Sequence, residues 1–113
     1  MEPRHRPAFL IPWAKWMDAR ARLVAVLSEA GALLRSHAVE HWPERLESHA
    51  ERVRLGHIDA VSALLAEFGG MGSFNDVWID PRNGHRITPD RVQPVNQHFD
   101  KLRAEIYRLA LSL

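Results

Sequence analysis

A short pattern near the middle of the sequence has the spacing of metal ligands. His37, Glu40 and His41 fit the H-x-x-E-H pattern of inverted zinc peptidases, in which both histidines bind zinc from one helical face and the glutamate acts as general base. Trp42-Pro43 follows directly, and a proline disfavours helical backbone at the residue before it. We therefore favour histidines that lie at a helix end, near its C-terminal dipole. A small zinc-binding enzyme or regulator using these three residues is the alternative.

A glycine-rich stretch at residues 69–73 has the composition of an anion-binding loop. It follows an expected helix instead of a strand, however, and no Gly-Lys-Ser/Thr completes a phosphate loop. We interpret Gly69, Gly70 and Gly72 as a structural turn after a helix, with the Asn75 side chain bonding to the turn backbone. Whether the turn also binds an anion stays open.

The residues after this turn could form a protein-binding surface. Trp78 alternates with Val77 and Ile79, so a strand that packs its aliphatic residues inward leaves the tryptophan exposed. An exposed tryptophan among charged residues is typical of a binding hot spot. The alternative is a tryptophan covered by the N-terminal arm or the first helix. The candidate partner-binding residues are Trp78, Asp76, Asp80, Arg82, His85 and Arg86.

Apolar spacing predicts the elements that position these residues. Residues spaced by three or four indicate helices over about 12–37, 43–55 and 58–68, and a last helix from about Pro94 to the end. Asp80-Pro81-Arg82-Asn83-Gly84 has turn chemistry between two short apolar runs, which predicts a hairpin of 77–79 with 85–87. The expected fold is mainly α: about four helices in a compact bundle, with a short β-hairpin between the third and fourth. Residues 1–12 are expected to be a flexible arm, and 13–113 a single domain.

The seam of the last helix also bears on partners. Val95, Phe99, Leu102, Ile106, Leu109 and Leu113 follow a heptad-like spacing, which over this length favours packing within a bundle. Leu111 lies off this seam, so a homodimer through the last helix stays open.

Composition narrows the function classes. The chain has 113 residues, 46% hydrophobic and 26% charged, the composition of one soluble globular domain. A net charge of +1, with arginines interleaved among acids, argues against nucleic-acid binding. No apolar run is long enough for a membrane span or a secretory signal, so we expect a cytoplasmic protein. The absence of cysteine excludes thiolate chemistry, and no motif calls for a cofactor.

The segment Phe68-Gly69-Gly70-Met71-Gly72-Ser73-Phe74-Asn75-Asp76, with His41-Trp42 and residues 102–110, resembles the signature of a family of small bacterial proteins whose domain has no assigned function. The resemblance covers about residues 33–111. It implies a bacterial cytosolic protein and assigns no catalytic residues. We therefore expect a non-enzymatic protein-binding module, more specifically an immunity or antitoxin-like inhibitor of a bacterial effector.

Overall fold

The computed structural model describes residues 12–113, with side chains described from residue 18 onward. Residues 1–11 of the predicted arm lie outside the described residues. The side chains of Trp13 and Trp16 are not described either. The described chain is mainly helical, which confirms the predicted class. With η marking a short 3-10 helix, its elements are α2 (Pro12–Ser36), α3 (Trp42–Arg54), α4 (Ala60–Leu65), η1 (Ala66–Phe68), η2 (Phe74–Asp76), η3 (Pro81–Asn83), η4 (Pro89–Arg91) and α5 (Val92–Leu111).

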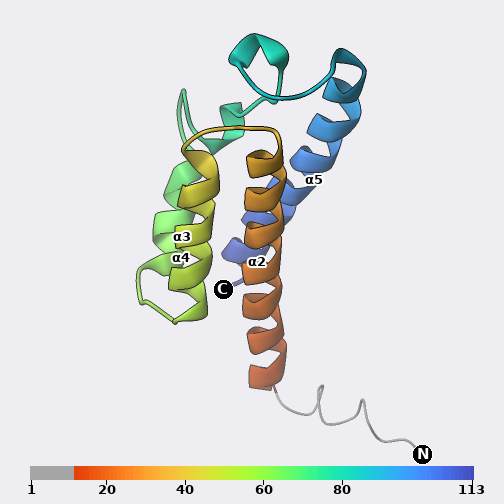
Figure 1. Cartoon of the computed structure of the whole chain (residues 1–113). Helices are drawn as coiled ribbons and strands as arrows, with labels where there is room; N and C mark the ends of the chain where they lie inside the picture. Colours follow the sequence, from red (N-terminus) through yellow and green to blue (C-terminus); the bar gives the residue numbers. More distant parts are fainter. Residues whose placement is uncertain (1–11) are drawn as a thin grey trace, which may run out of the picture.

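The long helix α2 packs against α3 and against α5, which passes behind α2 in Figure 1 and also contacts α4. Its buried face carries Leu23, Leu27, Ala30 and Leu34, spaced by three or four residues as the sequence predicted. Gly31 lies where α3 passes α2, and a Cβ atom added there would meet the Pro43 carbonyl oxygen at 3.5 Å. A Cβ would make only ordinary van der Waals contacts there, so the two helices pass near each other without requiring glycine at this position.

The last helix follows its predicted seam. Val95, Phe99, Leu102, Ile106 and Leu109 are all buried against the bundle. The third predicted helix is shorter than expected, because α4 begins at Ala60 and continues as the 3-10 helix η1.

The predicted β-hairpin is wrong, because residues 12–113 contain no strand. Both backbone groups of Ile79 bond to a single side chain: its N–H donates to Asn96 Oδ1 at 2.9 Å, and its carbonyl accepts from Asn96 Nδ2 at 2.8 Å. On the return segment, the Arg86 N–H donates to the His37 carbonyl at 2.7 Å. Since these groups have other partners, residues 77–79 and 85–87 do not form a ladder with each other.

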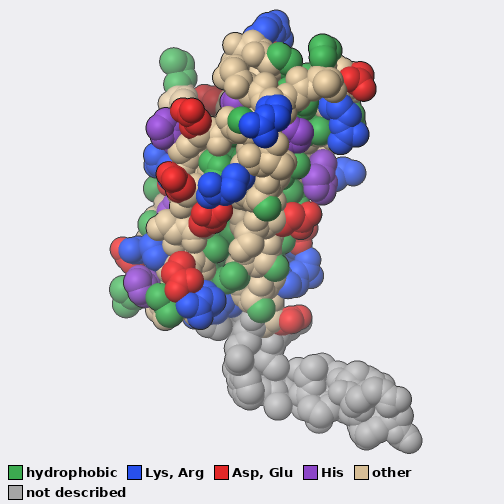
Figure 2. Space-filling view, in the orientation of Figure 1, with side chains coloured by type: hydrophobic (Ala, Val, Ile, Leu, Met, Phe, Trp, Pro, Cys, Tyr) green, Lys and Arg blue, Asp and Glu red, His purple; other side chains and the backbone are tan. Residues whose placement is uncertain are grey.

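These non-helical segments cover one end of the bundle, where α2 ends and α3 begins (Figure 1). On the face drawn in Figure 2, basic and acidic side chains are interspersed and neither sign forms a continuous patch. Within residues 12–113, no helix combines the length and apolar character that crossing a bilayer requires.

Candidate functional site

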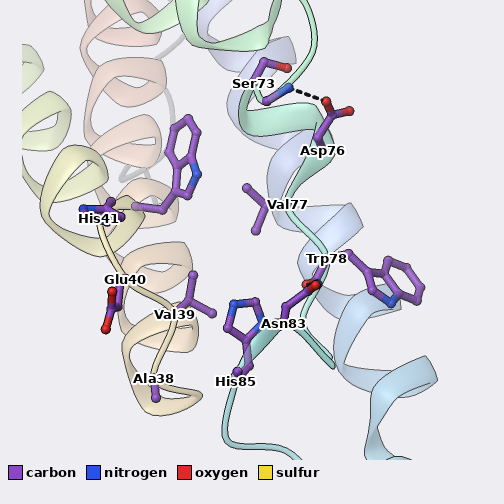
Figure 3. Close-up of a pocket in the computed structure, with 13 residues that line it drawn as sticks. Ala38, Val39, Glu40, His41, Ser73, Asp76, Val77, Trp78, Asn83 and His85 are labelled. Atoms are coloured by element: carbon purple, nitrogen blue, oxygen red, sulfur yellow. Dashed lines mark hydrogen bonds between the residues drawn. The ribbon is translucent and has the colours of Figure 1, made fainter. Parts of the chain in front are cut away.

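Three loops meet around an open cleft of about 450 Å³ at this end of the bundle (Figure 3). One wall comes from residues 38–42, where the chain passes from α2 into α3. A second comes from residues 72–78 around η2, and the third from residues 83–85, which begin at the last residue of η3. Val39, Val77 and the His85 ring point toward the hollow, whereas the Trp78 indole points away from it (Figure 3). Two aliphatic side chains and one imidazole thus face the hollow within a lining that also contains polar residues, and the tryptophan stands beside it.

The first wall begins with a helix-terminating motif. The Ala38 N–H donates to the Arg35 carbonyl and the Val39 N–H to the Leu34 carbonyl, the pattern of a Schellman motif. Its left-handed position is usually glycine, but here it is Ala38 with φ of 60°. His41, just before α3, also has a positive φ of 72°. A left-handed alanine costs about 1–2 kcal/mol. His41, with ψ of −49°, is the centre of a strained γ-turn that the Trp42 N–H closes on the Glu40 carbonyl, so two strained residues line the same cleft.

This loop separates the residues of the zinc pattern. The peptidase chemistry requires all three residues on one helical face. Because α2 ends at Ser36 and α3 begins at Trp42, the three residues of the pattern lie in the link between these helices and share no such face. The Nδ1 atom of His37 is hydrogen-bonded to the Arg86 carbonyl at 2.8 Å. Among the residues whose side chains are described, no three His, Asp or Glu side chains are placed to hold a metal ion. The geometry therefore gives the zinc alternative no support.

The side chains of Asn75 and Asp76 hold the glycine turn. Gly70 and Gly72 have positive φ angles of 82° and 75°, which glycine adopts at no steric cost. The Gly72 N–H donates to Asp76 Oδ2 at 2.6 Å, and Asn75 Nδ2 donates to the Phe68 carbonyl at 2.7 Å. Since Asp76 already accepts from the Gly72 amide, that amide is not available to an external anion.

A hydrogen-bonded network around Asp80 fixes the third wall. The Asp80 carboxylate accepts from Trp78 Nε1 at 3.2 Å and from the Arg82 backbone N–H at 2.9 Å, and it forms an ion pair with the Arg82 guanidinium. These interactions, with those of the Arg82 side chain first, lower the pKa of Asp80 from 3.8 to about 2. The Asp80 N–H in turn donates to His85 Nδ1 at 3.2 Å.

The network also determines the protonation of His85. Because Nδ1 accepts a hydrogen bond from an amide, we assign the proton of the neutral ring to Nε2. Burial is the main reason that the pKa of His85 lies below its ordinary value of 6.5. The negative charge of Asp80 raises this pKa, and His37 lowers it further. The ring that points into the cleft is therefore neutral at physiological pH.

Trp78 is an exposed aromatic residue on a fixed backbone. Its relative exposure is 38%, although its indole N–H is bonded to Asp80. Asn83 Nδ2 donates to the Trp78 carbonyl at 2.9 Å, and the neighbouring Ile79 is fixed by Asn96. The side chain therefore loses little conformational freedom if a partner covers it.

The structure links some of the predicted partner-binding residues and not others. Trp78, Asp80, Arg82 and His85 form one network. Asp76 lines the cleft but caps the glycine turn. Arg86 is exposed and connects to the end of α2 through its backbone.

Sequence reasoning did not place the 38–42 loop beside this surface. It gave Asn83 a role only in a turn, and it gave Asn96 none. Val39 and Trp42 line the cleft from that loop. Asn83 and Asn96 bond to the backbone of the Trp78 segment. The missed signal was asparagine itself, whose amide can satisfy both an N–H and a carbonyl of the backbone.

Comparison with known proteins matches part of the chain to a family. The sequence profile of a family described as domain of unknown function (DUF6966) matches residues 35–88, slightly less than half of the chain. No curated protein and no solved structure matches this chain. The matched span contains every residue that lines the cleft, and it also contains Trp78, Asp80 and Arg82. It ends before α5, so Asn96 belongs to the part of the chain that the profile does not match.

Proposed function

We propose that this chain is a non-enzymatic protein-binding module whose contact surface consists of Trp78 and the adjacent cleft. The observation that carries the proposal is that Trp78 is exposed while its indole N–H and the surrounding backbone are held by hydrogen bonds. Preorganised tryptophans on rigid scaffolds are enriched among binding hot spots.

The size of the expected contribution follows from the exposed area. With 38% of the side chain exposed and a full tryptophan offering about 250 Å², a partner would cover about 95 Å². At about 25 cal/mol per Å², this corresponds to roughly 2.4 kcal/mol, or about a 50-fold change in dissociation constant.

The cleft is a complementary feature beside this aromatic residue. Val39 and Val77 face its interior, and the neutral His85 ring provides a polar group there. We expect the partner to insert a side chain that has an apolar part for the two valines and a polar group for His85, while its surface covers Trp78. Trp78 would then fill a depression on the partner while the cleft receives a partner side chain, and such shape complementarity around an aromatic residue is typical of protein–protein interfaces.

We further propose that the partner is a bacterial effector, which this chain inhibits in the cytoplasm as an immunity protein or antitoxin does. Two features support this reading. A chain of 113 residues has the size of a one-domain inhibitor, and the loops that form the surface are anchored to the helical scaffold.

The test is co-expression with the product of the adjacent reading frame, followed by calorimetry on the purified complex. Trp78→Ala is expected to weaken binding about 50-fold. The matched control is Tyr107→Ala, which removes an aromatic residue of similar exposure (43%) on α5, away from the cleft, and should leave the affinity unchanged. Solitary purification of the wild-type chain, or equal effects of the two substitutions on affinity, would overturn the proposal.

A further inference from the structure

The outer face of α5 carries apolar side chains that the bundle covers only in part. Ala104, Tyr107 and Leu111 are exposed, the last two by 43% and 60%. Their spacing of three and four residues places them on one side of the helix. This face is separate from the buried seam, on which Leu109 lies.

A groove of about 750 Å³ lies beside this face. Its wall on the other side comes from Leu65, Phe68 and Gly69, at the end of α4 and in the turn that follows. The Phe68 ring packs against Tyr107 with centroids 5.0 Å apart and against Phe74 in the core at 5.3 Å. The groove therefore has a firm aromatic wall connected to the core.

We propose that this groove and the exposed face of α5 form a homodimer interface, in which α5 of a second copy lies antiparallel to α5 of the first and crosses it near Ala104. Tyr107 and Leu111 line this groove themselves, so the exposed face of α5 and the groove form one apolar surface. A two-fold axis places this surface of one copy against the same surface of the other, as a self-complementary interface requires. Ala104 is small enough to allow close approach of the two helices at the crossing.

The charges that flank Ala104 favour this register. Asp100 lies four residues before Ala104 and Arg108 four residues after it, so in the antiparallel pairing Asp100 of each copy faces Arg108 of the other. Both side chains are more than half exposed. Within the described residues, their ion-pair partners are neighbours on the same helix, Arg103 and Glu105. Each therefore retains exposed surface for a partner across the interface.

The proposal uses no part of the Trp78 surface and does not depend on the proposed function.

The first test is the molecular mass of the full chain by sedimentation equilibrium, at concentrations from about 1 µM to about 1 mM, the range expected for a small interface. The wild type is expected to approach the mass of two chains as concentration rises. Leu111→Glu should raise the dissociation constant about ten- to hundredfold, the loss expected for a buried leucine side chain. The matched control is Leu55→Glu, which changes a leucine of similar exposure (55%) outside the groove and should not affect association.

The second test uses charge reversal to examine the register. Asp100→Arg and Arg108→Asp should each weaken the dimer, because each places like charges opposite one another, and the double variant should restore it. Arg103 keeps its bonds to the Phe74 and Val77 carbonyls when Asp100 is replaced, and circular dichroism checks that each variant is folded. The mass of a single chain at every concentration would overturn the proposal, as would a dimer unaffected by Leu111→Glu. Failure of the double variant to recover would overturn the antiparallel register.

Discussion

The hydrogen bonds from Asn96 to Ile79 make a specific prediction about stability. Asn96 is only 2% exposed, and its side-chain amide bonds to both the N–H and the carbonyl of Ile79, whose side chain is fully buried. A third bond runs from Asn96 Nδ2 to the Val92 carbonyl at 2.7 Å. We therefore consider Asn96→Leu, which keeps the number and branching of the side-chain heavy atoms and removes all three bonds.

The expected cost comes mainly from the Ile79 backbone. Val92 lies in the first turn of α5, where the helix itself can supply a donor to its carbonyl. The two Ile79 groups have no such substitute, and a buried polar group without a partner costs about 1–3 kcal/mol. The free energy of unfolding should therefore fall by about 4 kcal/mol, a large part of the roughly 5–15 kcal/mol of a typical domain.

Urea unfolding followed by circular dichroism measures this change. The matched control is Gln97→Leu, which alters the exposed neighbouring residue and should change the unfolding free energy by less than about 0.5 kcal/mol. Hydrogen exchange of the Ile79 amide should accelerate in Asn96→Leu, because the amide loses its acceptor. A loss below about 1 kcal/mol would refute the reasoning, since it would mean that Asn96 does not satisfy these buried groups.

Three further predictions concern the loops around the cleft. Ala38→Gly should stabilise the chain by about 0.5–1 kcal/mol in thermal unfolding, because Ala38 has a φ of 60° that glycine adopts without strain; a destabilised variant would contradict this. Gly72→Ala should cost about 1–2 kcal/mol in the same assay, since a Cβ meets no atom there but φ is 75°, and an unchanged midpoint would argue against it. Because the pKa of His85 is lowered from 6.5, the unfolded chain binds its proton more readily than the folded chain. The contribution of His85 to stability should therefore be complete above pH 6.5, the pKa of the unfolded chain, and should decrease as the pH drops below 6.5. Urea midpoints should show this loss, and His85→Gln should reduce it; an equal loss in both chains would exclude His85 as the cause.

The helices could be predicted because their signal is local. Residues three or four positions apart share a helical face, so the spacing of Leu23, Leu27 and Leu34 identifies a buried face before any partner is known. The same reasoning located the α5 seam. The exposure of Trp78 followed from the two-residue alternation of an extended chain, which applies to residues 77–79 even though they form no sheet.

The path of residues 77–87 could not be predicted in this way. Turn chemistry around Asn83-Gly84 is consistent both with a hairpin and with the observed 3-10 helix, which ends at the C-cap residue Gly84 with a φ of 81°. The choice depends on hydrogen-bond partners that are distant in sequence: Asn96 lies 17 residues from Ile79, and His37 lies 49 residues from Arg86. These contacts exist only once α2 and α5 have packed.

The cleft depends on the same long-range contacts. The strained loop at Ala38 and His41, the glycine turn and the Asp80 network are each local structures that residue types could suggest. Their meeting around one hollow is not local, because it requires the end of α2 to lie beside residues 85 and 86. Apolar periodicity indicates which side of a helix is buried, but backbone donors and acceptors in loops bond to whichever polar groups the packed helices bring near them.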